Sequence, residues 1–270
     1  MGTGRPPDRK QGIFETLLVL AGHPVELEAH MDRIGASLTS AFAAELPTGA
    51  RDLVRERAKG LSLGRLRLTV TPVAHGLDYG VVTAAVDPET FFPEEGADLR
   101  SVQLSGGLGR DKWADRSALP SGADGAIPLL LDGEEVLEAG WANIFIVDSG
   151  KLVTPAADER ILPGIARAAT VEIAREAGIE VEERRLDRDE LIGAEAVFLT
   201  GSVRGIGPAR SLDGIPLGTG SRLIRQLADG LKRRWWGQVE PSASADSLRQ
   251  LLDRAQSGQD AVGPLGEVAQ

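Results

Sequence analysis

One acidic residue, Glu138, lies in an apolar stretch of the sequence and is a candidate for chemistry. The residues from Ala139 to Ala142 are small or aromatic and carry no charge. An ionised carboxylate in apolar surroundings is costly unless a cation or a hydrogen-bond donor meets it. We therefore expect Glu138 to have a partner, although a single Glu near a strand end is commonly solvated.

The residues that follow Glu138 predict an anion-binding site at the start of a helix. Two strand-like runs, 144–147 and 151–154, are joined by a turn at 148–150, and Pro163 and Gly164 then open a helix expected over 164–177. A proline at a helix start gives up an N–H that had no partner, and the other free amides of the first turn point at whatever lies ahead. An anion suits that position.

The segment 138–167 resembles the signature of the class IV aminotransferase family of pyridoxal-phosphate enzymes. The resemblance implies that pyridoxal 5′-phosphate is the cofactor, that Glu138 faces its pyridine nitrogen, and that amides around Gly164 and Ile165 hold its phosphate. The matching positions are Glu138, Gly140, Asn143, Ile144, Phe145, Leu152, Thr154, Leu162, Gly164, Ile165 and Arg167.

Lys112 is the lysine that this resemblance selects from the five in the chain. It follows a glycine-rich run, 105–109, but the nucleotide-binding motif needs Gly-Lys-Ser/Thr, so we reject a phosphate-loop interpretation. The sequence KWADR at 112–116 resembles the lysine segment of the lyase branch of the family, which implies that Lys112 binds the cofactor covalently. Nearby cations such as Arg110 or Arg116 would favour its deprotonated, nucleophilic form. The alternative is a surface lysine in a loop.

The resemblance assigns further residues to the cofactor and the substrate. Arg33, within the sequence HMDR, is expected on a helix and implied to contact the phosphate, and the Ser202 hydroxyl is implied to do the same. Ala166, Asn143 and Val203 complete the expected cofactor site. We further hypothesise that Arg204 pairs with a substrate carboxylate. The alternatives are an exposed helix charge for Arg33 and an ordinary solvated turn for Ser202 and Arg204.

The expected fold is α+β, and the resemblance implies a two-domain, fold-type IV pyridoxal-phosphate enzyme. A small N-terminal α/β sandwich domain is expected over 1–90, an interdomain linker over 91–98, a larger domain with a mixed, β-barrel-like sheet flanked by helices over 99–236, and a mobile tail over 237–270. Composition at 87–96 favours a linker, because prolines and acids disfavour regular structure. We expect strands at 13–19, 25–27, 63–71, 79–86, 99–104, 144–147, 151–154, 179–186 and 196–200, and helices at 28–44, 49–59, 164–177, 189–192, 219–236 and 247–254.

Composition restricts the class of protein. The chain has 270 residues, of which 42% are hydrophobic and 26% charged, as is typical of a soluble globular protein. No membrane span or signal peptide is recognisable, so we expect a cytoplasmic protein. The absence of cysteine excludes disulfides and cysteine metal sites, and no metal site is expected. A net charge of −10 argues against nucleic acid as a partner.

The resemblance points to the 4-amino-4-deoxychorismate lyase branch of the family. The segments KWADR and SVRG resemble that branch, and the chain has Arg116 and Ser117 where aminotransferases of the family often have a tyrosine. The segment GPARSLDG resembles the aminotransferase branch instead, so an aminotransferase acting on branched-chain or D-amino acids is the alternative. Only 26 positions separate Lys112 from Glu138, which leaves open a catalytically silent member that binds the cofactor or assembles with a partner. The family implies a small-molecule amino substrate and a homodimer.

Overall fold

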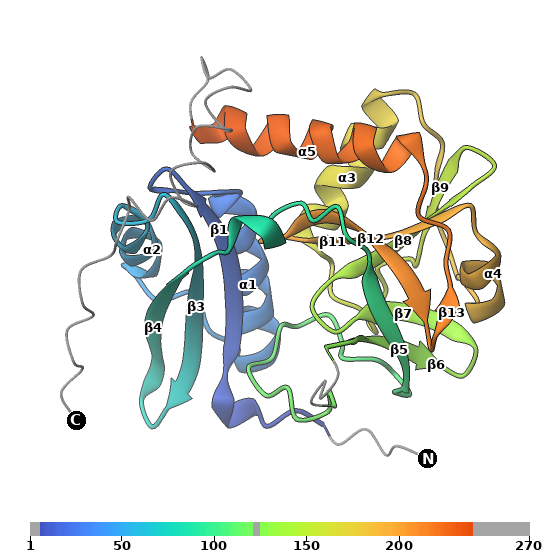
Figure 1. Cartoon of the computed structure of the whole chain (residues 1–270). Helices are drawn as coiled ribbons and strands as arrows, with labels where there is room; N and C mark the ends of the chain where they lie inside the picture. Colours follow the sequence, from blue (N-terminus) through green and yellow to red (C-terminus); the bar gives the residue numbers. More distant parts are fainter. Residues whose placement is uncertain (1–5, 121–124, 240–270) are drawn as a thin grey trace.

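The computed structural model describes residues 6–120 and 125–239, which form two β-sheets and the helices around them (Figure 1). This confirms the expected α+β class. The first sheet and its two helices come from the N-terminal part of the chain, and the larger mixed sheet comes from the remainder. Among the described residues, no helix is both long enough and apolar enough to cross a membrane.

The small sheet is antiparallel and has the strand order β2-β1-β3-β4. Residues on alternate positions of a strand point to opposite faces of the sheet. Ile13 and Leu17 on β1 face α1 and α2 and form an apolar core with them, whereas Phe14 and Thr16 face the other side. The elements of this part are η1 (Arg9–Gln11), β1 (Ile13–Leu20), β2 (His23–Pro24), α1 (Leu27–Phe42), α2 (Ala50–Ala58), β3 (Leu63–Val73) and β4 (Gly76–Ala85).

The large sheet is mixed and has the order β10-β9-β8-β11-β12-β5-β6-β7, with β13 paired to β12. Strand β5 runs parallel to both β6 and β12, and most other pairs are antiparallel. The elements are η2 (Pro88–Thr90), β5 (Ala97–Gln103), β6 (Ile127–Asp132), β7 (Glu135–Ala139), β8 (Asn143–Asp148), β9 (Lys151–Thr154), α3 (Ile165–Glu176), β10 (Val181–Glu183), α4 (Arg188–Gly193), β11 (Ala196–Gly201), β12 (Gly205–Leu212), β13 (Ile215–Pro216) and α5 (Arg222–Val239).

The large sheet curls, which confirms its expected barrel-like form. Strand β7 ends the strand order, yet the chain passes from it directly to β8 in the middle of the sheet, and Ala139 forms a bridge with Ala142. Helices α3 and α5 cover one face of the sheet (Figure 1). Phe91 and Phe92 join the same apolar core beside Trp235, so the expected linker region is anchored by aromatic side chains.

Several element boundaries differ from the expectation. The return strand of the first hairpin is His23–Pro24 rather than 25–27, and the strand expected over 179–186 is only Val181–Glu183. Helix α5 continues to Val239, past its expected end at 236. Strands β6, β7, β12 and β13 were not expected, because none of their sequences shows a strict alternation of apolar and polar residues. The expected helix at 247–254 lies outside the described residues.

Candidate active site

A cavity beside the N-terminus of α3 brings together most of the residues proposed from the sequence. Those that line it are Arg33, Lys112, Glu138, Asn143, Gly164, Ile165, Ala166 and Ser202. Val203 and Arg204 instead line a wider adjoining cavity, which shares Lys112 and Ser202 with the first. After the roles predicted from the sequence, we refer to the first as the cofactor cavity and to the second as the substrate cavity. The structure thus separates two of the predicted residues from the remaining eight.

The first strand of the small sheet and an apolar core hold the lysine segment in place. The Phe14 amide donates to the Lys112 carbonyl at 2.9 Å, and the Ala114 amide donates to the Gly12 carbonyl at 2.9 Å. Trp113 is 8% exposed in the core of the small sheet and packs edge-on against Phe42. The stretch after the lysine, at 117–119, contains turns.

Burial makes Lys112 a better nucleophile than an exposed lysine. Removal from water lowers the pKa of its amine to about 8. The carboxylates of Glu15 and Glu138 oppose this shift, whereas Arg33 and Arg116 favour it. An amine with a lowered pKa has a larger neutral fraction at physiological pH, and the neutral form is the one that attacks an aldehyde.

Glu138 also lines the cofactor cavity and has few hydrogen-bond partners. Its side chain is 5% exposed and accepts a hydrogen bond of 3.3 Å from the Leu162 amide. Burial raises the pKa of Glu138 to about 8, although the Leu162 amide and three nearby cations oppose the shift. A ring nitrogen that shares a proton with this carboxyl would compensate for its burial.

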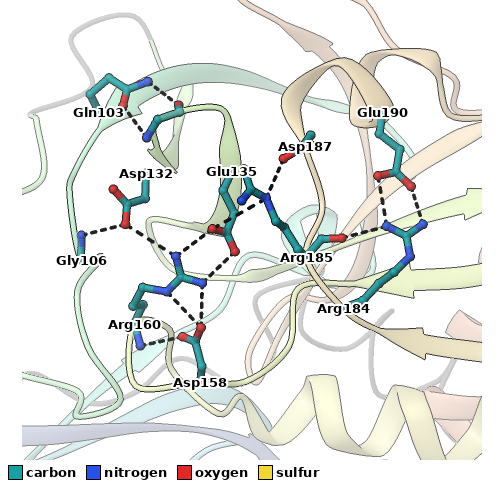
Figure 2. Close-up of polar contacts among 11 residues, drawn as sticks. Gln103, Gly106, Asp132, Glu135, Asp158, Arg160, Arg184, Arg185, Asp187 and Glu190 are labelled. Carbon is teal, nitrogen blue, oxygen red and sulfur yellow. Dashed lines mark hydrogen bonds and ion pairs between the residues drawn. The ribbon is translucent and has the colours of Figure 1, made fainter.

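The loop before α3 is anchored at two points to β7, the strand that carries Glu138. Arg160 donates to both carboxylate oxygens of Glu135 at 2.8 and 2.7 Å and also contacts Asp158 and Asp132 (Figure 2). Two residues on, Leu162 meets Glu138. The Arg160 carbonyl lies so close to Gly107 that a Cβ there would approach it to 2.1 Å. The loop therefore takes its shape from β7 and from the glycine-rich run.

The N-terminus of α3 lines the cofactor cavity. Gly164 precedes the helix and has no side-chain cap, so the first amides of α3 remain directed at the cavity. Asn143 donates to the Leu162 carbonyl at 3.0 Å, and its oxygen lies where a Cβ on Gly164 would come within 1.9 Å. Asn143 thus shapes the loop, and only glycine fits at position 164.

Thr200 is a residue that the sequence analysis missed. It is 1% exposed, lines the cofactor cavity, and its hydroxyl has no hydrogen-bond partner among the described residues. Thr200 lies opposite Asn143 in the β8–β11 pair, and directly opposed residues project to the same face of a sheet. A buried hydroxyl without a partner indicates that a polar group completes the site. The sequence feature that could have identified Thr200 is its hydroxyl, two positions before Ser202.

Arg33, on α1, lines the same cavity and contacts the loop before α3. Its Nη1 donates to the Pro163 carbonyl at 2.9 Å, and its Nε and Nη2 each donate to Glu15 at 2.7 Å. Glu15 was also missed by the sequence analysis. The signal was an acid inside the apolar strand IFETLLVL, the same kind of signal that selected Glu138.

The substrate cavity, of about 720 Å³, is lined by four arginines. Arg67 and Arg116 are half-buried beside the Phe14 ring, with their guanidinium carbons 3.8 and 5.3 Å from its centroid. Arg65 and Arg204 lie at the exposed rim, where Arg204 stacks on Trp141 at 4.9 Å. Among the described residues, none of the four has a carboxylate within ion-pair distance. The alternation of RLRL on β3 was the sequence signal for Arg65 and Arg67.

Known proteins resemble this chain in sequence and in fold. The profile of the amino-transferase class IV family matches residues 105–212. A probable branched-chain-amino-acid aminotransferase from Aquifex aeolicus is 40% identical over 119 residues, which are 44% of this chain and 38% of that protein. The chain therefore spans less than two fifths of that relative's length.

Two solved structures share most of the fold. One is a 4-amino-4-deoxychorismate lyase from Pseudomonas aeruginosa, with a TM-score of 0.66 and 26% identity, covering 86% of this chain and 95% of the other. The second is the T.th. branched-chain amino acid aminotransferase complexed with N-(5′-phosphopyridoxyl)-L-glutamate, with a TM-score of 0.69 and 21% identity, covering 83% and 85%. The architecture is that of the fold-type IV enzymes, as expected.

The match of residues 105–212 to the class IV aminotransferase family confirms the resemblance. Members of this family are enzymes that use pyridoxal 5′-phosphate. The residues of the cofactor cavity fit that group. Thr200 has a buried hydroxyl in need of a partner, and α3 offers free amides to a phosphate. Within the described part of the chain, no cation forms an ion pair with the buried carboxyl of Glu138, although three lie near it.

Proposed function

We propose that this protein is a pyridoxal-phosphate-dependent lyase that acts on 4-amino-4-deoxychorismate and releases pyruvate and 4-aminobenzoate, a step of folate synthesis. The observation that supports this choice is the set of four arginines in the substrate cavity. Each product carries one carboxylate, so the substrate carries two. A cavity lined by arginines without carboxylate partners suits such a dianion better than a branched aliphatic side chain.

The residues of the cofactor cavity have distinct roles in this proposal. The bound cofactor would act as an electron sink for the substrate carbon that carries the amine. Arg33, the amides of Ile165 and Ala166, and the Ser202 and Thr200 hydroxyls would hold its phosphate. Asn143, Gly164 and Val203 would shape the surroundings of these groups.

Lys112 would hold the cofactor and then move the proton of the reacting carbon, while Glu138 would keep the ring nitrogen protonated. Glu138 is buried and Lys112 partly buried, and loss of contact with water brings the pKa of each group to about 8, which suits proton transfer near neutral pH. Arg204 would pair with a substrate carboxylate at the rim of the cavity. Loss of the proton from the carbon that bears the amine would expel the pyruvate-forming group from the neighbouring carbon.

An aminotransferase is the second candidate. The Aquifex aeolicus relative is named a branched-chain-amino-acid aminotransferase, and arginines can also bind the second carboxylate of 2-oxoglutarate. Proton return to the cofactor, rather than loss of a neighbouring group, would then follow proton removal.

Two incubations separate the candidates. The purified, cofactor-loaded protein is incubated with 4-amino-4-deoxychorismate, and separately with branched-chain or D-amino acids plus 2-oxoglutarate. Formation of 4-aminobenzoate and pyruvate in the first incubation alone supports the lyase, and glutamate in the second alone supports the aminotransferase. The variant Lys112→Ala is the control for both, since it should form neither product.

Borohydride reduction tests the cofactor assignment before any substrate is used. Reduction of the loaded protein followed by peptide mapping should place the pyridoxyl label on Lys112. Label on another lysine contradicts the assignment, and a protein that takes up no cofactor would be a catalytically silent member. We also propose that the protein forms a homodimer and is located in the cytoplasm. Sedimentation equilibrium tests the first of these proposals.

A further inference from the structure

Glu15 is a buried acid whose position no part of the proposed chemistry explains. It lies in the middle of β1 and is 1% exposed, and the neighbouring residues on its face of the strand, Ile13 and Leu17, belong to the apolar core. A carboxylate at such a position is destabilising unless nearly all of its hydrogen-bonding capacity is used. Its contacts therefore indicate what it does.

Two residues of α1 surround the Glu15 carboxylate. Arg33 donates to Oε1 from Nε and to Oε2 from Nη2, each at 2.7 Å, so the two planar groups form a bidentate pair. The His30 ring nitrogen Nδ1 lies 2.7 Å from Oε2. Burial by itself would raise the pKa of Glu15, but Arg33 and His30 lower it far below its usual range, so the group is ionised.

This arrangement fixes the orientation of the Arg33 guanidinium group. A guanidinium has five N–H donors. Glu15 receives two of them and the Pro163 carbonyl receives a third, from Nη1 at 2.9 Å. One N–H remains on each terminal nitrogen, and Arg33 lines the cofactor cavity together with Gly164, Ile165 and Ala166.

We propose that Glu15 is a positioning residue that aims the two remaining N–H groups of Arg33 at an anion held by the N-terminus of α3. This inference rests on the proposed function, in which that anion is the phosphate of the cofactor. Glu15 does not itself touch the phosphate. Its effect must therefore depend on the presence of the phosphate and on the presence of Arg33.

The experiment compares two aldehydes that differ only in the phosphate. Dissociation constants of pyridoxal 5′-phosphate and of pyridoxal are measured by absorbance titration of the cofactor-free full chain, and their ratio gives the preference for the phosphate. In Glu15→Gln this preference should fall by roughly tenfold to a hundredfold, by analogy with the loss that follows when the partner that orients a metal ligand is removed. Affinity for pyridoxal should change less than twofold, a margin of about the additivity error of such comparisons.

Two further variants test the route of the effect. In an Arg33→Met background, Glu15→Gln should not lower the preference again, because the donor that it orients is gone. Asp98→Asn is the matched control, since Asp98 also forms a bidentate pair, with Arg210 at 2.9 and 2.5 Å, but lies outside both cavities. It should leave the preference unchanged.

The outcomes are distinguishable. Equal loss of affinity for both aldehydes in Glu15→Gln, or no loss for either, overturns the role of Glu15. A wild-type protein without preference for the phosphate overturns the cofactor site itself, and with it this inference. If Glu15→Gln does not fold, as judged by near-UV circular dichroism, Glu15→Asp replaces it. The shorter acid should lower the preference by a smaller factor, and an unchanged preference in that variant contradicts the proposal.

Discussion

The amide of Phe14 and the carbonyl of Lys112 are joined by a hydrogen bond of 2.9 Å, although the two residues belong to different parts of the fold. The lysine segment thereby continues the edge of the small sheet, and the Lys112 amine lies 5.2 Å from the centroid of the Phe14 ring. The small sheet thus determines where the amine lies relative to the cofactor cavity, which is built mainly by the large sheet.

The lowered pKa of Lys112 should be visible in its rate of acetylation. Because burial lowers the pKa of Lys112 to about 8, its neutral fraction should rise from about one tenth at pH 7 to about nine tenths at pH 9. Competitive acetylation with acetic anhydride and peptide mapping, on the cofactor-free protein, measures this. Lys151 is the internal control, because hydrogen bonding to Glu180 raises its pKa and its profile should lie at higher pH. Coincident profiles contradict the prediction.

The raised pKa of Glu138 should make the cofactor-free protein less stable as pH rises. Burial raises the pKa of this carboxyl from 4.5 to about 8, so the folded state holds a proton that the unfolded state loses. The contribution of the protonated Glu138 carboxyl to the free energy of unfolding is fully present below pH 4.5 and is lost as pH rises through about 8. Glu138→Gln cannot ionise, so its melting temperature relative to that of wild type should increase between pH 5 and pH 8.5. A constant difference between the two proteins would rule this out.

Substitution of Trp113 should mainly lower the free energy of unfolding, whereas substitution of Trp141 should mainly weaken substrate binding. Trp113 is 8% exposed and packs against Phe42, so Trp113→Ala should cost about 3–5 kcal/mol in free energy of unfolding and displace the lysine segment. Trp141 is 42% exposed and supports Arg204, so Trp141→Ala should cost less than about 1 kcal/mol but raise KM. Denaturant titration and steady-state kinetics measure the two effects. Equal losses of stability would show that Trp113 is not the anchor.

The anchored loop before α3 should control how tightly the cofactor is held. Arg160→Met removes the contacts to Glu135 and Asp158 that hold the loop, so cofactor affinity should fall, whereas stability should fall by no more than about 1 kcal/mol because the pairs are partly exposed. Arg184→Met is the control, since Arg184 pairs with Glu190 away from the loop (Figure 2) and also with Glu182. Equal cofactor affinity in the two variants, measured by absorbance titration, would argue against a role for the anchor.

The arginines of the substrate cavity should be needed for a dianionic substrate. Arg67→Met keeps most of the apolar stem beside Phe14 but removes the charge, which should cost about 1.5–3 kcal/mol of transition-state binding, or roughly tenfold to a hundredfold in kcat/KM. Arg55→Met, on the exposed face of α2 beside Glu28, is the control and should have little effect. The measurement is initial rates with the substrate that the incubations identify. An unchanged kcat/KM in Arg67→Met would refute a dianion site.

The sequence alone was sufficient for the family and for the cofactor cavity in outline. The segment 138–167 is contiguous, and it contains Glu138, the loop and the start of α3 in one local unit. Local rules, such as the proline and glycine before a helix, act within a few residues and can be recognised without knowing the fold. Lys112 could be selected for a similar reason, because its neighbours form a recognisable segment.

The tertiary structure alone decided which distant residues complete the site. Glu15 and Arg33 are 18 positions apart in the sequence, and Arg33 and Pro163 are 130 apart, yet each pair forms a hydrogen bond. The arginines of the substrate cavity come from β3, from the turn after Lys112 and from the β11–β12 connection. Such contacts depend on strand register and on the docking of one sheet against another, since a shift of one residue would turn each side chain to the opposite face. A pattern of residue types within one segment does not specify that register.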